Sequence, residues 1–92
     1  YLGELYIMEK DIIKDKVLKL FQNRLNKDFS GKEELLDVPL FGLEIGIHAF
    51  ELVYIFFDIE REFNIHISEK DIQEGKLSTI NTIINMIDSY KL

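Results

Sequence analysis

Apolar residues recur every three or four positions along most of this chain, and this period most constrains what it can fold into. Such spacing places side chains on one face of an α-helix. The clearest faces are Ile13, Val17, Leu20, Phe21 and Leu25 in the first segment, and Ile80, Ile83, Ile84 and Ile87 in the last. No pair of stretches alternates as neighbouring strands would. The sequence therefore predicts an all-α fold.

Breaking and capping residues predict four helices. Their expected bounds are about Glu9–Leu25, Ala49–Phe63, a short helix between Ser68 and Gly75, and a last helix after Ser78. Asn26 and Asn64 are the expected stops of the first two helices. Ser68 and Ser78 are the expected N-caps of the last two, because a serine hydroxyl accepts a hydrogen bond from a free backbone N–H group. An up-and-down bundle is the simplest arrangement of these helices.

The stretch 27–48 between the first two helices is long and irregular. Gly31, Pro39, Gly42 and Gly46 interrupt it. It is nevertheless apolar, and we expect these side chains to cover a surface: Phe29, Leu35, Leu36, Leu40, Phe41, Leu43, Ile45 and Ile47. A loop of this length in a compact domain generally packs or has a function.

Composition limits the classes of function. The 92 residues fit one domain, 1–92, and the absence of cysteine excludes disulfides, thiolate metal sites and a cysteine nucleophile. The net charge of −6 disfavours nucleic acid as a partner and favours basic protein surfaces. No apolar run approaches the ~20 residues that span a bilayer, and no signal peptide is evident, so we expect a cytoplasmic protein. Met8 is one candidate for the natural start, with 1–7 as an N-terminal extension.

Two stretches resemble acyl carrier proteins. "LFGLEIGIHAFELVYIFFDIEREFNIHI" is similar to the loop end and second helix of that family, and "SEKDIQEGKLSTINTIINMI" to its third and fourth helices. Glu60, Glu62 and Phe63 match the end of the family's second helix, and 77–79 match the connector into the last. The resemblance covers about Glu9–Tyr90. It implies an acyl-carrier-protein-like four-helix bundle with a long loop between the first and second helices.

The family's attachment motif, Gly-x-Asp-Ser-Leu, is altered in this chain. Its serine hydroxyl carries phosphopantetheine, but the matching residues are Gly46, Ile47, His48, Ala49 and Phe50. Ala49 occupies the serine position and His48 the preceding aspartate position. An alanine methyl cannot form the phosphodiester, and the only hydroxyl between Gly31 and Ser68 is that of Tyr54. We therefore expect no phosphopantetheine. Carrier-related proteins without this serine accompany bacterial peptide-maturation enzymes, and the chain is similar to that group.

The remaining polar residues do not indicate catalysis. His48 is expected to meet the N-terminal end of the second helix, and His66 lies between two isoleucines. Neither has partners at metal-ligand spacing, so no metal is predicted. Tyr54 and Asp58 are one turn apart, but the sequence shows no neighbour that would tune them for acid–base chemistry. We expect a non-enzymatic protein.

The second helix carries a further stripe that its core face does not need. The core face is expected to be Leu52, Ile55, Phe56, Ile59 and Phe63, and the further stripe is Phe50, Tyr54, Phe57 and Arg61. In the family these positions lie toward partner enzymes, and Glu51 and Glu60 retain some of its acidic character. These six residues are the predicted docking set. Alternatively, the stripe is covered by Tyr1, Leu2, Leu5, Tyr6 and Ile7.

Three functions follow as hypotheses. The first is an accessory domain that docks on a biosynthetic enzyme without holding a substrate, with a peptide-maturation enzyme as the narrower alternative. The second is a degenerate or unusual carrier of fatty-acid, polyketide or nonribosomal peptide synthesis. The third is a structural oligomerisation module. An exposed aromatic stripe implies a protein partner, and the chain itself is expected to be a monomer or a weak dimer.

Overall fold

The computed structural model describes residues 2–90, with side chains from residue 9 onward. The elements are helix α1 (Leu2–Leu25), the 3-10 helix η1 (Glu33–Leu35), and helices α2 (Ala49–Phe63), α3 (Glu69–Gln73) and α4 (Ile80–Tyr90). No strand occurs in 2–90, so the all-α prediction with four helices is confirmed. The predicted bounds of α2 are those observed, whereas α1 begins at Leu2 rather than near Glu9.

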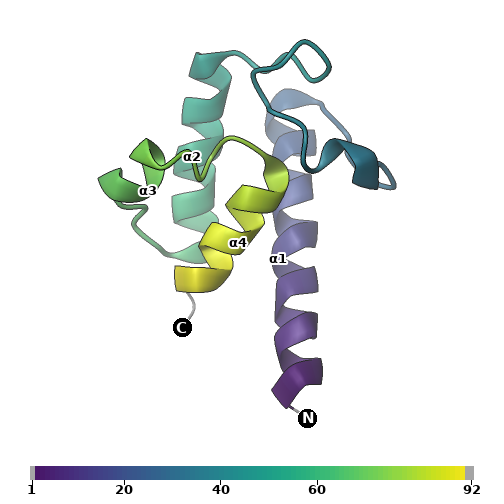
Figure 1. Ribbon diagram of the computed structural model, residues 1–92, viewed down its shortest axis with the longest axis vertical. Helices are drawn as coiled ribbons and strands as arrows, with labels where there is room; N and C mark the ends of the chain where they lie inside the picture. Colours follow the sequence, from purple (N-terminus) through teal and green to yellow (C-terminus); the bar gives the residue numbers. More distant parts are fainter. Residues whose placement is uncertain (1, 91–92) are drawn as a thin grey trace.

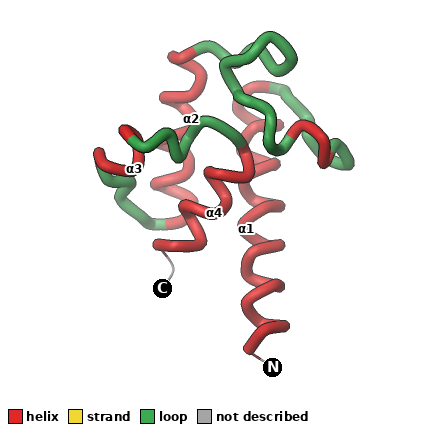
Figure 2. The backbone as a smooth tube through the Cα atoms, in the orientation of Figure 1, coloured by secondary structure: helices red, strands yellow, loops and turns green. Residues whose placement is uncertain are grey.

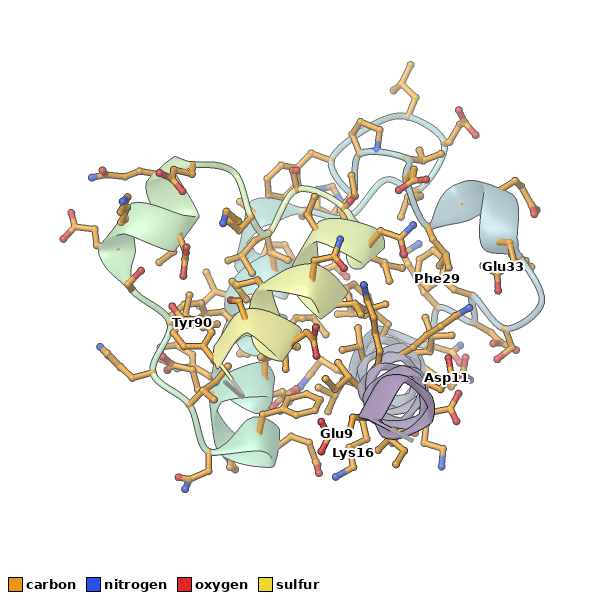
Figure 3. All side chains as sticks on the ribbon, turned by 60° about the horizontal axis from the view of Figure 1, so that its bottom comes forward. Glu9, Asp11, Lys16, Phe29, Glu33 and Tyr90 are labelled. Atoms are coloured by element: carbon orange, nitrogen blue, oxygen red, sulfur yellow. The ribbon has the colours of Figure 1, made fainter. Side chains whose placement is uncertain are left out.

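Helix α1 is the element against which α2 and α4 pack. In Figure 1, α1 and α2 run antiparallel, and the first turns of α1 extend past the end of α2. Helix α3 lies on the side of α2 away from α1 in both Figure 1 and Figure 3. Helix α2 is thus flanked by α1 and α3, and one long side of it remains to face outward.

The core forms where the apolar faces of α1, α2 and α4 meet. Its fully buried centre includes Val17, Phe21, Ile55, Ile59, Ile80, Ile83, Met86 and Ile87. Leu20 and Leu25 of the predicted α1 face are only half-buried, as are Leu52 and Phe56 of α2. The isoleucine stripe of α4 is buried throughout, as its spacing predicts. Removal of this apolar surface from water supplies the main stabilisation of the bundle.

The connection from 26 to 48 packs onto the bundle and contains only the short helix η1 (Figure 2). Five of its apolar side chains are buried: Phe29, Leu36, Leu40, Ile45 and Ile47. The Phe29 ring meets the Phe21 ring edge to face, with centroids 5.6 Å apart, and Figure 3 shows Phe29 beside α1. The backbone of the 26–48 connection is also hydrogen-bonded to the segment just before α4, since Leu40 N donates to Ser78 O at 2.9 Å.

Two apolar residues of this connection do not cover a surface, contrary to the expectation. Phe41 is 58% exposed and Leu43 is fully exposed. The backbone explains the difference, because Gly42 N donates to Pro39 O at 3.0 Å and closes a tight turn. That turn directs the segment after Leu40 away from the core. The chain returns at Ile47, whose N–H donates to Leu40 O at 2.9 Å.

The helix ends confirm two expected stops and one expected cap. Asn26 and Asn64 adopt left-handed backbone conformations, with φ of 56° and 53°. The Ser68 hydroxyl accepts a hydrogen bond from Asp71 N at 3.1 Å and caps α3. The prediction for Ser78 is wrong. Thr79 lies directly before α4, and its hydroxyl accepts from Thr82 N at 3.1 Å while Thr82 Oγ1 accepts from Thr79 N.

Candidate functional site: the outer face of helix α2

The first turn of α2 is held by a hydrogen bond from the backbone of His48 to the side chain of Glu51. His48 precedes the helix in an extended conformation, and its N–H donates to the Glu51 carboxylate at 2.9 Å. The His48 ring stacks on Phe50, with centroids 5.8 Å apart and planes within 5°. His48 therefore meets the start of the helix, as the sequence predicts. Glu51, a predicted docking residue, is half-buried and its carboxylate holds the turn before the helix.

Ala49 is the first residue of α2 and is exposed. It lies at one end of an open apolar groove of about 340 Å³ between α2 and the α3 region. The groove is lined by Ala49, Leu52, Val53, Phe56, Phe57, Ile72 and Leu77. The sequence did not indicate this groove, because Ile72 and Leu77 approach α2 only through the path of the chain after Phe63.

With side chains described from residue 9 onward, the further stripe of α2 is exposed. Phe50, Tyr54 and Phe57 are 63%, 51% and 53% exposed, and the Arg61 side chain is 75% exposed. Ile55 and Ile59, on the opposite side of the helix, are completely buried. We call Phe50, Tyr54, Phe57 and Arg61 the outer face of α2. Three aromatic rings and a guanidinium therefore lie along one helix face in contact with solvent.

Val53 is a further exposed apolar residue on this helix, at 51%, which the docking set omits. It lies next to the outer face and also lines the groove. The periodicity of the sequence places it between the two apolar stripes, so the pattern alone assigns it to neither. Together with Phe57 it joins the outer face to the groove.

An ion pair between α1 and α2 borders the outer face and was missed by the sequence reasoning. Arg24 of α1 donates two hydrogen bonds to the Asp58 carboxylate, both at 2.8 Å, and Asp58 is buried. The Arg24 guanidinium also lies over the Tyr54 ring, 5.4 Å from its centroid. The sequence shows no neighbour for Asp58, whereas in the structure the hydrogen bonds from Arg24 hold the pKa of its carboxyl below the usual value. A charge on another helix leaves no local signal in the sequence.

Arg61 is the second cation of this region. Its guanidinium lies 3.8 Å from Asp58 Oδ1, an oxygen that already accepts a hydrogen bond from Arg24. Because the Arg61 side chain is largely exposed and this pairing is long, its N–H groups are accessible to a carboxylate or an aromatic ring of a partner.

Glu60, the other acidic residue of the docking set, lies away from the outer face. Its carboxylate accepts a hydrogen bond from Ile67 N at 2.8 Å and lies 3.3 Å from His66 Nδ1. The Glu60 side chain is only 18% exposed, whereas His66 is almost fully exposed. Glu60 therefore fixes the connector after α2. The structure brings Phe50, Tyr54, Phe57 and Arg61 together on one face, with Glu51 at its start, and directs Glu60 toward the connector instead.

The alternative prediction is that side chains of residues 1–7 cover the outer face. These side chains lie outside the part that the structure describes. The backbone of α1 from Leu2 onward is described, and its first turns extend past the Phe63 end of α2 (Figure 1). Phe50 and Tyr54 lie toward the other end of that helix.

Within the described residues, no group of three or more His, Cys, Asp and Glu side chains could hold a metal ion. No helix among residues 2–90 has the length and apolar character to cross a membrane. Comparisons of the chain with protein-family models, with curated proteins and with solved structures find no match. We therefore infer function from the residues and geometry of α2.

Proposed function

We propose that this protein is a non-catalytic, carrier-related accessory domain that docks on a biosynthetic enzyme through the outer face of α2. The observation that supports it most is the exposed aromatic stripe on a helix whose first residue is Ala49. Buried aromatic and arginine side chains contribute most of the binding energy of many interfaces. More than half of each of these four side chains remains exposed to water in the bundle, so a protein partner is the natural occupant.

The residues at the start of α2 do not fit a phosphopantetheine group. Attachment needs a hydroxyl at the exposed first turn of the helix, and Ala49 supplies only a methyl. The hydroxyl of Tyr54 belongs to a ring that lies against Arg24, more than one turn along the helix. We therefore propose docking without a carried substrate, which separates this protein from a degenerate carrier.

Peptide maturation is the narrower proposal for the pathway. It follows from the resemblance of "LFGLEIG" and of the aromatic second helix to carrier-related proteins that accompany such enzymes. The partner proposed on this ground is a peptide-modifying enzyme encoded beside this chain. Fatty-acid or polyketide enzymes in that place would instead favour the degenerate carrier.

Intact mass spectrometry separates the accessory domain from a carrier. The wild-type protein is incubated with coenzyme A and a broad-specificity phosphopantetheinyl transferase, and we expect no gain in mass. Ala49→Ser is also expected to load poorly, because His48 and Phe50 replace the acid and the leucine that flank the serine in the family. A gain of one prosthetic group by the wild type would refute the accessory function, and rapid complete loading of Ala49→Ser would refute the flanking-residue argument.

Docking is tested with the double variant Tyr54→Ser, Phe57→Ser. Since both rings are about half exposed, we expect a change in unfolding free energy of about 0.5 kcal/mol or less for each substitution. Binding to the enzyme encoded beside this chain should become weaker by about 2 kcal/mol or more in binding free energy, as measured by calorimetry. Phe41→Ser, an equally exposed aromatic residue outside α2, is the matched control. A large loss of stability, or an unchanged affinity, would contradict docking through this face.

A further inference from the structure

The residue spacing of the outer face of α2 is the same read from either end, and this symmetry is what an interface with a second copy of the chain requires. The residues of this face follow one another at intervals of four, three and four, which is the spacing of a coiled-coil seam. The order from the N-terminal end is aromatic, aromatic, aromatic, arginine. A two-fold axis halfway between Tyr54 and Phe57 exchanges Tyr54 with Phe57 and Phe50 with Arg61.

We propose that two copies of this chain pair through their α2 helices in an antiparallel, two-fold symmetric dimer. In this register Tyr54 of each copy lies opposite Phe57 of the second copy, and two aromatic pairs form at the centre. Phe50 lies opposite Arg61 of the second copy at each end, where a guanidinium meets an aromatic ring. Every residue of the face therefore has a partner of compatible chemistry, as an isologous interface requires.

The charges select the antiparallel orientation. Arg61 lies in the last turn of α2 and Glu51 in the first turn. An antiparallel pair brings the Arg61 guanidinium of one copy to the turn that holds Glu51 of the other, whereas a parallel pair would place the two Arg61 side chains together. The helix dipoles also oppose each other in the antiparallel pair. Asp58 does not change this preference for the antiparallel orientation, since its buried carboxylate is already paired with Arg24.

The exposed area limits the strength of this pairing. An aromatic side chain offers about 150–250 Å², so rings that are half exposed leave roughly 100 Å² each to be buried. With Val53 and Arg61 the face amounts to about 500 Å² per copy, or about 1,000 Å² in total, at the lower limit of specific interfaces. The dimer is therefore weak and concentration-dependent, so an enzyme that docks on the same face can displace one copy.

Sedimentation equilibrium over a concentration series tests the pairing on the full chain. The wild type should change from monomer to dimer between low micromolar and millimolar concentration. Phe57→Ser should weaken dimerisation at least tenfold, because the two-fold axis makes each substitution count twice. Phe41→Ser should leave it within twofold of the wild type. A wild-type protein that stays monomeric at millimolar concentration, or a dimer unaffected by Phe57→Ser, would overturn the proposal.

A complementation experiment tests the register. Arg61→Glu places an acid opposite Phe50 and beside Glu51 of the second copy, and Phe50→Lys places two cations together, so each variant alone should dimerise poorly. When the two variants are mixed, a heterodimer has one unaltered Phe50–Arg61 contact and one contact in which the introduced lysine faces the introduced glutamate. Dimerisation of the mixture should therefore recover. Absence of recovery would refute this register. Calorimetry against the enzyme of the proposed function separates the two ideas, since a chain can dock without pairing or pair without docking.

Discussion

Two leucines of the same connection provide a matched test of how residues 26–48 stabilise the bundle. Leu40 is 1% exposed, and Leu43, three residues later, is fully exposed. Leu40→Ala removes three carbons, worth about 2.4 kcal/mol at roughly 0.8 kcal/mol for each buried methylene. The cavity left behind adds to this, and buried Leu→Ala substitutions typically cost about 3–5 kcal/mol. We expect a loss of about 3–4 kcal/mol at Leu40 and of about 0.5 kcal/mol or less for Leu43→Ala.

A loss of this size is large for the domain. At roughly 0.05–0.15 kcal/mol per residue, a 92-residue chain has a stability of about 5–14 kcal/mol. Leu40→Ala should then lower the Tm by about 12–30 °C, and Leu43→Ala should leave it nearly unchanged. Urea unfolding followed by circular dichroism measures both free energies. If Leu40→Ala costs under about 1 kcal/mol, or if both variants lose the same amount, the connection is not part of the cooperative core and our reasoning is refuted.

Two further predictions concern an ion pair and a helix end. The pKa of Asp58 is lowered by hydrogen bonds from Arg24, so its stabilising contribution is present above the pKa of an unfolded aspartate, about 3.9, and is lost as the pH falls through the lower folded value. Asp58→Asn should therefore lower the Tm by several degrees at pH 7, and this loss should diminish as the pH falls below about 3.9; a loss that stays constant with pH would contradict the assignment. Asn64 has φ of 53°, so Asn64→Ala should cost about 1 kcal/mol in urea unfolding while Asn64→Gly costs less; the opposite order would show that the backbone conformation is not what matters there.

The sequence predicted the features that depend on local pattern. The isoleucine spacing of α4 and the apolar face around Ile59 of α2 give correct helices and a correct core, because a 3.6-residue period directly reflects burial. Ser68 was also identified correctly, since an N-cap and the N–H group that it satisfies are close in sequence. The outer face of α2 follows from the same reasoning, because its residues fall opposite the core face.

Features that depend on contacts between distant residues were not predictable. Arg24 pairs with Asp58 across two helices, and nothing adjacent to either residue indicates the other. Glu60 appears as a free surface acid in the sequence, yet a backbone N–H of the following connector turns its carboxylate inward. Phe41 and Leu43 were expected to pack, but the turn at Gly42 directs them outward. In each case the tertiary path of the backbone, and not the residue type, determines the environment.

Tyr90, at the end of α4, has a consequence for how the domain opens locally. Its hydroxyl accepts a hydrogen bond from Ser68 N at 2.8 Å and donates to Asp71, so it holds the first turn of α3 (Figure 3). A helix of five residues does not persist by itself in water. The opening equilibrium of α3 is therefore coupled to fraying at the end of α4. Amide hydrogens of α3 should exchange in concert with those of the last turn of α4, far faster than amides at the centre of α2, so the two segments form one low-stability unit of the chain.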